Sequence, residues 1–350
     1  MKLLELLKIV YEKKASDLHL IVDTKPSMRI NGELEPICEE IITKEDIEDI
    51  TKNELFAKNE KKFLEFIKHK EMDFSINTNF GRFRTNLSLE KSNISAVFRF
   101  IPEKVPSFDD LRSPDIFKKI INNNKGLVLV TGPTGVGKST TLAAMINEIN
   151  EKEFKKIVTI EDPIEFVHKP KKSIIAQRAV GIDTLSFEEG LKRTLRQDPD
   201  VILIGEIRDR ISAEIAIQAA NTGHLVFSTL HTVSAAETLN RIVDFFHFQE
   251  SKKIRDQLAS NLICIISQEL IPRIDGGRIA AEEVLYNNES IKELIRSDRI
   301  KDIYSYMQSN EDAHLGFTQT QRLKELMNHG EIIFEQAMKF SHHKDELNSF

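Results

Sequence analysis

The sequence predicts an α/β protein, with a parallel β-sheet and a phosphate-binding loop, preceded by a smaller α+β domain. Three observations lead to this class. The segment 132–139 has two glycines separated by four residues and followed by Lys and Ser, which is the phosphate-loop pattern. From residue 127 onward, short apolar runs alternate with helical patterns, as in parallel sheets. Before residue 102, strand patterns outnumber helical ones.

Composition narrows the class of protein further. The chain has 350 residues, of which 40% are hydrophobic, and a net charge of −6, so we expect two or three domains and no coating by nucleic acid. Its two cysteines, Cys38 and Cys264, lack metal-ligand spacing and indicate a reducing compartment. No apolar run approaches a membrane span, and Glu5 and Lys8 interrupt the leucine-rich start. We therefore expect a cytoplasmic protein without a signal peptide.

The first hundred residues predict a small α+β domain. Apolar residues at helical spacing indicate one helix over 3–11 and a second one that begins after the capping Thr43. Asn31-Gly32 is a strong hairpin signal. The predicted strands cover 16–22, 27–30, 33–37, 72–76, 81–89 and 94–101.

Three arginines lie on the last two of these strands. Arg82 and Arg84 flank Phe83, so on a strand they share one face and Phe83 points to the other. Arg99 lies on the next strand. Such arginines are either part of a solvated strand face or a cationic face presented to the nucleotide of a neighbouring subunit.

The second domain begins after a short linker. Prolines at 102 and 106 stiffen the chain, and Ser113-Pro114 is typical of a helix start, with Ser as the N-cap and Pro at the first helical position. Beyond Asn288 the pattern indicates short helices. The predicted divisions are an N-terminal domain at 1–101, a linker at 102–114, a phosphate-loop domain at 115–288 and a C-terminal helical region at 289–350.

Within the phosphate-loop domain, buried strands and helices alternate. Two capping boxes, Ser186 with Glu189 and Ser234 with Glu237, begin helices. Beyond Gln249 the alternation stops, and the spacing indicates a helix that carries Leu262 and Ile265. The predicted strands are 127–130, 156–160, 201–204 and 225–229, with a later hairpin leading into 279–286.

The phosphate loop itself predicts nucleotide binding. Its glycines let the backbone wrap a phosphate chain, and the unpaired N–H groups at the following helix start face the anion. Lys138 would reach the β and γ phosphates, and Ser139 would ligate Mg²⁺. The expected phosphate-binding residues are Gly132, Pro133, Thr134, Gly135, Val136, Gly137, Lys138, Ser139 and Thr140.

Acidic residues follow two of the strands, at the sheet edge where ligands of parallel sheets bind. Glu206 ends the 201–204 strand like a Walker B glutamate, placed to hold Mg²⁺ through water or to orient the attacking water. Glu161 and Glu165 are candidate general bases, and Asp162 is a candidate metal ligand. Each could instead be a solvated carboxylate.

Two histidines bracket the 225–229 strand. His231 follows the strand beside the expected site and could sense the γ-phosphate by hydrogen bonding. His224 precedes the strand and is a second candidate for the same role. Three further cations, Arg193, Arg196 and Arg208, could supply an arginine finger or pair with acidic neighbours.

These motifs together resemble one family, the secretion ATPases of type II secretion and type IV pili. The phosphate loop matches GPTGxGKSTT. The remaining boxes are similar to the family's Asp box at 159–166, its Walker B at 198–209 and its His box at 222–232. Four boxes in the right order are a specific signal. Three N-terminal segments, 15–20, 81–84 and 96–102, also resemble the family.

The resemblance also bears on the direction of movement. The segment 290–296 resembles one associated with pilus-retraction members, although Lys292, Glu293 and Ser297 depart from it. The last residues, around His342 and His343, match weakly. Extension members usually carry a long extra N-terminal region and a four-cysteine zinc site. This sequence shows neither, so retraction is the expectation.

The resemblance implies a PAS-like N-terminal domain, a RecA-like ATPase domain and a homohexameric ring that hydrolyses ATP with Mg²⁺. It implies twitching motility powered by pilus retraction, at the cytoplasmic side of the inner membrane, through a membrane platform protein and, indirectly, pilin. It also implies that N-terminal-domain arginines, for which Arg82, Arg84 and Arg99 are the candidates, complete the nucleotide site.

Other functions stay open at this point. An accessory pilus ATPase or a type II secretion ATPase would share every motif. A RecA-like nucleic-acid translocase would need a basic, aromatic-bearing channel, which the charge balance does not favour. A nucleotide switch that never hydrolyses would need no base, so Glu206 and the carboxylates near Glu161 argue against it.

Overall fold

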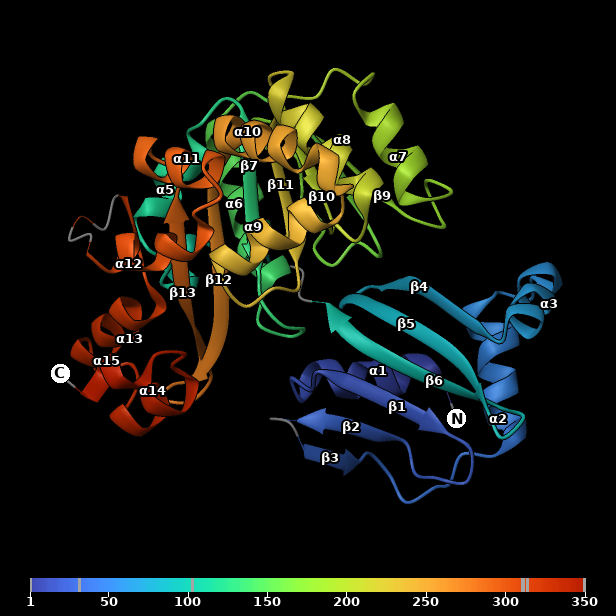
Figure 1. The fold of residues 1–350 in the computed structure, drawn as a ribbon. Coiled ribbons are helices and arrows are strands. Elements are labelled where there is room, and N and C mark those ends of the chain that lie inside the picture. The colour runs from blue at the N-terminus through green and yellow to red at the C-terminus, as the bar shows by residue number, and fades with distance from the viewer. Residues whose placement is uncertain (1, 31–32, 102–103, 310–311, 313–314, 349–350) are drawn as a thin grey trace. The chain divides into compact units, whose positions relative to one another are not determined.

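The computed structural model describes residues 2–30, 33–101, 104–309, 312 and 315–348. The chain forms two compact units, Met1–Lys104 and Val105–Phe350 (Figure 1). The predicted hairpin turn at Asn31-Gly32 and the first linker residues, Pro102 and Glu103, lie outside the described residues.

The N-terminal unit is one antiparallel sheet with helices, as its α+β pattern predicts. The strand order is β3-β2-β1-β6-β5-β4. Phe83 and Phe98 are fully buried in its core. The elements are α1 (Leu3–Glu12), β1 (Asp17–Ile21), β2 (Ser27–Ile30), β3 (Glu33–Pro36), α2 (Lys44–Asp49), a π-helix (Ile50–Leu55), α3 (Glu60–His69), β4 (Glu71–Thr78), β5 (Gly81–Glu90) and β6 (Asn93–Ile101).

Helix α3 is absent from the elements predicted above. Asn59 caps it by accepting a hydrogen bond from the Lys62 amide. Phe66 is its one buried side chain, while Leu64 and Ile67 are exposed. Its apolar residues Phe63, Leu64, Phe66 and Ile67 do recur at helical spacing, so this helix has a local signal in the sequence.

The second unit is built on an eight-stranded sheet with the order β14-β13-β12-β7-β11-β10-β8-β9. The strands from β12 to β9 in this order are parallel, and β13 and β14 are antiparallel to their neighbours. The strands are β7 (Gly126–Thr131), β8 (Lys156–Glu161), β9 (Ile174–Ala179), β10 (Val201–Ile204), β11 (Leu225–Leu230), β12 (Leu262–Pro272), β13 (Arg278–Tyr286) and β14 (Gly316–Phe317).

Helices cover both faces of this sheet (Figure 1). Two apolar cores result, one beneath α7–α12 and one beneath α4–α6. The helices are α4 (Phe108–Leu111), α5 (Ile116–Ile121), α6 (Lys138–Lys152), α7 (Phe187–Thr194), α8 (Arg210–Asn221), α9 (Ala235–Asp244), α10 (Ser251–Asn261), α11 (Glu289–Arg296), α12 (Ile303–Gln308), α13 (Gln319–Asn328), α14 (Phe334–Phe340) and α15 (Lys344–Asn348), with 3-10 turns at Phe248–Glu250 and Ile300–Asp302.

Two predicted boundaries in this unit are wrong. The helix expected to carry Leu262 and Ile265 ends at Asn261, and a strand begins at once. The helix expected to start at Pro114 starts at Ile116, while Ser107 caps the unpredicted α4 instead. The strands β9 and β14 were not predicted either.

The helices α13, α14 and α15 pack against the β12–β13 hairpin. Ile271 and Ile279 of the hairpin pack against Leu323, Leu326 and further residues of α13–α15 in a separate apolar cluster. The C-terminal helical region and the phosphate-loop region therefore share one compact unit.

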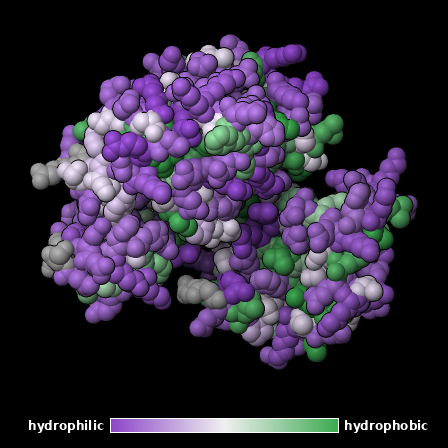
Figure 2. Space-filling view, in the orientation of Figure 1, coloured by the Kyte–Doolittle hydropathy of each residue, from purple (hydrophilic) through white to green (hydrophobic). Residues whose placement is uncertain are grey.

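The face of the molecule shown in Figure 2 is mainly hydrophilic, with hydrophobic residues scattered over it. Among the described residues, no helix combines the length and the apolar character that crossing a bilayer requires.

Candidate active site

The phosphate loop joins β7 to α6 at the centre of the sheet. All six residues of β7 are buried, which fixes the strand from which the loop leaves. Gly132 has φ 139°, and a Cβ there would collide with the carbonyl oxygen of Gln268. Gly137, with φ 89°, begins α6 in the left-handed region. Only glycine suits both positions, so the two motif glycines are required by the backbone.

Lys138 points back into the loop. Its Nζ donates hydrogen bonds to the carbonyl oxygens of Gly132 at 2.7 Å and Pro133 at 2.9 Å. It also lies 3.5 Å from Nδ1 of His231. Burial lowers the pKa of Lys138, and the carboxylates of Glu206 and Glu165 oppose this shift. The ammonium therefore lies against the backbone of the loop.

Glu206 follows β10, and hydrogen bonds at Gly205 hold the backbone in place there. The Gly205 amide donates to the Ile160 carbonyl at 2.8 Å, and the Thr229 hydroxyl donates to the Gly205 carbonyl at 2.7 Å. These bonds tie the end of β10 to both neighbouring strands. The glutamate is therefore presented at the same sheet edge as the phosphate loop.

Two cationic or protonatable side chains contact this carboxylate. Arg208 forms an ion pair with Glu206, and Nε2 of His231 lies 3.5 Å from it. The hydrogen bond to Glu206 raises the pKa of Arg208. Lys138, His231, Glu206 and Arg208 thus form a continuous chain of contacts.

The backbone beyond Arg208 is also fixed. Asp209 caps α8, accepting a hydrogen bond from the Ser212 amide at 2.8 Å, while the Ser212 hydroxyl accepts from the amides of Arg208 and Asp209 at 3.2 Å. Asp209, three residues after Glu206, is therefore the N-cap of α8.

The carboxylates after β8 are in different surroundings. Glu161 accepts hydrogen bonds from Thr159 at 2.6 Å and from Gln177 at 3.2 Å. Burial raises the pKa of Glu161, and these two hydrogen bonds lower it. Asp162 is exposed, and its charge contributes to the raised pKa of Arg208. Glu165 acts electrostatically on Lys138, so all three lie near the site.

Contrary to the prediction, His224 does not lie at this site. His224 lies at the amino end of β11, where its carbonyl accepts from the Gly126 amide at the start of β7. Its Nδ1 contacts the Ala219 carbonyl at 3.0 Å and the Thr222 hydroxyl at 3.2 Å. Because ligands of parallel sheets bind at the carboxyl ends of strands, His224 belongs to the opposite edge.

A small cavity of about 40 Å³ lies behind the loop and is lined by a histidine that no sequence motif indicates. Ser139, Glu161, Thr229 and His168 are among its lining residues. His168 is buried, and burial lowers its pKa to about 4. Its Nδ1 has no hydrogen-bond partner among the described residues. The cavity is large and polar enough for an ordered water.

A second cavity, of about 150 Å³, opens beside the loop. Gly137, Thr140 and Thr141 line one side of it. Arg112, after α4, and the β12–β13 hairpin, including Arg273 and Arg278, supply the other walls. No sequence motif indicates these walls, because they come from segments far apart in the chain. We call this cavity the side cleft.

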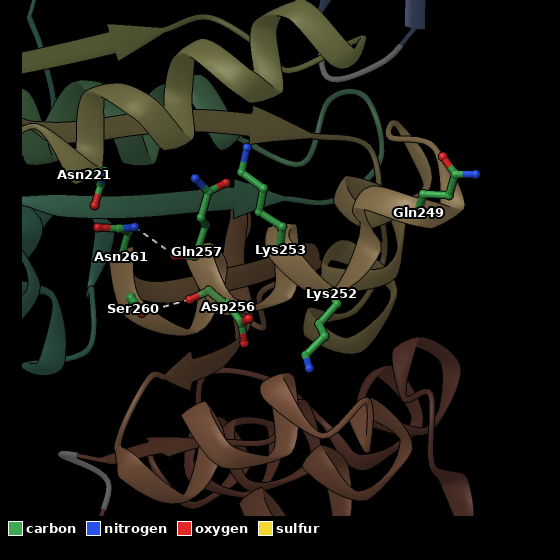
Figure 3. A pocket seen from close by; sticks show the side chains of 8 residues that line it. All are labelled: Asn221, Gln249, Lys252, Lys253, Asp256, Gln257, Ser260 and Asn261. Carbon is green, nitrogen blue, oxygen red and sulfur yellow. Dashed lines mark hydrogen bonds between the residues drawn. The ribbon is translucent and has the colours of Figure 1, made fainter.

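A wider, open groove of about 540 Å³ runs along α10. Figure 3 shows its lining, which is polar: Asn221, Gln249, Lys252, Lys253, Asp256, Gln257, Ser260 and Asn261. None of the residues predicted to bind nucleotide lines it, so it is separate from the phosphate-loop site.

The three arginines of the N-terminal unit share one face of its sheet. Arg84 lies directly opposite Arg99 across β5 and β6, and Arg82 follows the same alternation along β5. Phe83 is buried on the other face, as predicted. Arg99 pairs with Asp17 at 2.8 Å, and Arg84 lies 3.9 Å from Asp73.

The remaining predicted cations differ in position. Arg208 contacts Glu206 as described. Arg193 pairs with Glu189 at 3.2 Å along the exposed side of α7, which is the ion-pair alternative rather than an arginine finger.

Comparison with known proteins identifies close relatives. A family model described as "Type II/IV secretion system protein" matches residues 3–339. The chain is 44% identical over 310 residues to the "Type IV pilus retractation ATPase PilT" of Pseudomonas aeruginosa, covering 88% of this chain and 89% of that one. It is 38% identical over 346 residues to the "Type IV pilus ATPase PilU" of the same species, covering 98% of this chain and 89% of that one.

One solved structure matches the whole chain. It is titled "Crystal Structure of the Pilus Retraction Motor PilT and Bound ADP", has a TM-score of 0.91 and 41% identity, and covers 100% of both chains. The mixed α/β class, with an N-terminal domain and an ATPase domain, is thereby confirmed.

Proposed function

Because this chain belongs to the Type II/IV secretion system protein family, we propose that it is an ATP-hydrolysing motor that powers type IV pilus retraction. The observation that carries this proposal is the contact chain Lys138–His231–Glu206 at the phosphate loop. It is set in a fold that matches an ADP-bound retraction motor over its whole length. The charge of −6 gives no support to a nucleic-acid translocase.

In this function the loop amides and Lys138 hold the phosphates of ATP, and the side cleft takes the nucleoside. The side cleft suits this role because Gly137 and Thr140 line both it and the loop. A phosphate chain bound on the loop would leave its sugar and base there.

Ser139 and Glu206, with Asp162 nearby, are the residues that would hold Mg²⁺. Hydroxyl and carboxylate oxygens are the ligands this ion prefers, and Ser139 shares the 40 Å³ cavity with Glu161. When bound, Mg²⁺ would neutralise charge on the phosphate oxygens.

Water activation falls to Glu206 or Glu165. The Glu161 carboxylate is held by Thr159 and Gln177, which favours a supporting role for it. His231, in contact with Lys138 and Glu206, is placed to report the γ-phosphate to both.

The same proposal assigns the motor a homohexameric ring on the cytoplasmic side of the inner membrane, where it acts on pilin indirectly through a platform protein. Family membership supports this assembly. We keep 1–101, 102–114, 115–288 and 289–350 as the proposed functional divisions of each subunit.

Deletion of the gene is expected to leave cells with excess surface pili and without twitching motility, because assembled pili would no longer be withdrawn. Electron microscopy of the deletion strain, with counting of pili per cell, measures this. The control is the same strain complemented in trans. A bald strain would instead identify an extension motor.

An accessory role also has support, because the match to PilU covers 98% of this chain. A normal pilus count in the deletion strain, together with weak retraction, would favour that role over the primary motor.

Mixed rings are expected to recover ATPase activity that neither variant has alone. Arg82, Arg84 and Arg99 share one sheet face, and arginine binds phosphate oxygens bidentately. We therefore place them at the γ-phosphate of an adjacent subunit. Lys138→Ala subunits mixed with Arg82→Ala/Arg84→Ala subunits would form some interfaces in which both partners are intact.

The measurement is phosphate release across mixing ratios, with subunit exchange followed by fluorescence energy transfer. As a control, Lys138→Ala subunits are mixed with Lys138→Ala subunits that carry a second label. Exchange without recovery at any ratio would show that these arginines do not act in trans.

A further inference from the structure

Two walls of the side cleft come from outside the phosphate loop. One is the segment after α4, which includes Arg112, and the other is the β12–β13 hairpin, which includes Arg273. The following inference rests on the proposed function, in which the nucleoside part of ATP occupies this cleft.

A single carboxylate connects the two walls. Glu331 lies in the turn between α13 and α14, where its side chain is largely buried. One of its oxygens pairs with the Arg112 guanidinium, and the other accepts from Nε of Arg273 at 3.0 Å. Its main-chain carbonyl also accepts from the amide of Ile274, at 3.0 Å. Glu331 thus bridges both walls without lining the cleft.

A second residue from the same helices supports the Arg112 wall. Arg322 is buried on α13 and pairs with Glu282 at 3.0 Å. Its Nη2 donates to the carbonyl of Arg112 at 2.9 Å. Arg112 has φ 52°, a left-handed conformation that non-glycine residues hold only when their surroundings impose it. The position of this wall therefore depends on α13 and the turn after it.

We propose that Glu331 is a positioning residue for the nucleoside end of the nucleotide site, so that the C-terminal helices set the affinity for nucleotide. Without its charge, the guanidinium groups of Arg112 and Arg273 would lose their shared counter-ion, and their mutual repulsion would separate the walls. Contacts to the phosphates, made by the loop, would not change.

The test compares two ligands on the full-length protein. Calorimetric titration with ADP reports both ends of the site, and titration with pyrophosphate reports the phosphate loop alone. For Glu331→Gln we expect the Kd for ADP to rise at least ~tenfold, the scale of a disrupted, partly buried ion pair. The Kd for pyrophosphate and the kcat at saturating MgATP are expected to stay within about twofold of wild type, since the loop contacts persist.

Glu335→Gln is the matched control, because it makes the same charge change at an exposed position of α14. Glu331→Asp keeps the charge on a shorter side chain and is expected to restore part of the ADP affinity. It also provides the test if the Gln variant does not fold.

Three results would contradict the inference in different ways. Unchanged ADP binding in Glu331→Gln overturns the inference and leaves the proposed function intact. Equal losses of ADP and pyrophosphate binding would show that Glu331 only maintains the fold, which also overturns it. Wild-type protein that binds neither ADP nor ATP overturns the proposed function itself, and the inference with it.

Discussion

Lys138→Ala is expected to abolish ATP hydrolysis while the fold stays intact. The substitution removes the ammonium, which would neutralise charge that develops on the β and γ phosphates. Loss of one such group in a preorganised site typically lowers kcat by ~10²–10³-fold. Its present partners are the carbonyl oxygens of Gly132 and Pro133.

Steady-state phosphate release at saturating MgATP measures the effect, and circular dichroism checks the fold. Lys152→Ala is a matched control, because this lysine lies at the other end of the same helix, where it pairs with Glu148. Near-normal turnover by Lys138→Ala would refute the assignment of the phosphate loop.

Glu206→Gln is expected to bind MgATP but to hydrolyse it at least ~100-fold more slowly, the usual scale for loss of a positioned base or metal-linked carboxylate. The amide keeps the shape of the side chain beside Arg208 and His231 and removes its charge. Nucleotide binding should persist because the loop amides and Lys138 are unchanged. Single-turnover hydrolysis, measured alongside nucleotide binding, separates the two steps.

Glu165→Gln identifies the base by comparison. If Glu206→Gln alone slows the chemical step, Glu206 is the base and Glu165 tunes the charge around Lys138. If Glu165→Gln alone slows it, Glu165 is the base and Glu206 has the supporting role. Glu214→Gln, at an exposed position of α8, controls for the loss of a negative charge nearby. Full hydrolysis by both variants would exclude a carboxylate base at either position.

The centre of the site could be predicted because its signals are local. Fully buried parallel strands read as continuous apolar runs, so 201–204 is predicted with its observed bounds. Side chains that directly follow such strands must meet at one sheet edge. The same rule excludes His224, which precedes its strand.

Features that depend on long-range packing were not predictable from the sequence. Leu262 continues the spacing of Ile254 and Leu258, and periodicity alone cannot distinguish a helix that continues from a buried strand that begins. The pairing of Arg112 with Glu331 joins segments that no motif connects. The burial of His168, and hence its low pKa, likewise depends on what packs over it.

The capped backbone beyond Glu206 has a mechanical consequence. A helix cap contributes ~1 kcal/mol, and the Asp209–Ser212 pair holds the amides of Arg208, Asp209 and Ser212 within one short segment. Such a segment is stiff, so we expect a displacement of Glu206 to be transmitted along it instead of being absorbed. The load would arrive at α8, which packs against α7 and α10. We therefore expect the flexibility of such a motor to lie elsewhere in the subunit. The stiff junction between β10 and α8 would then transmit force.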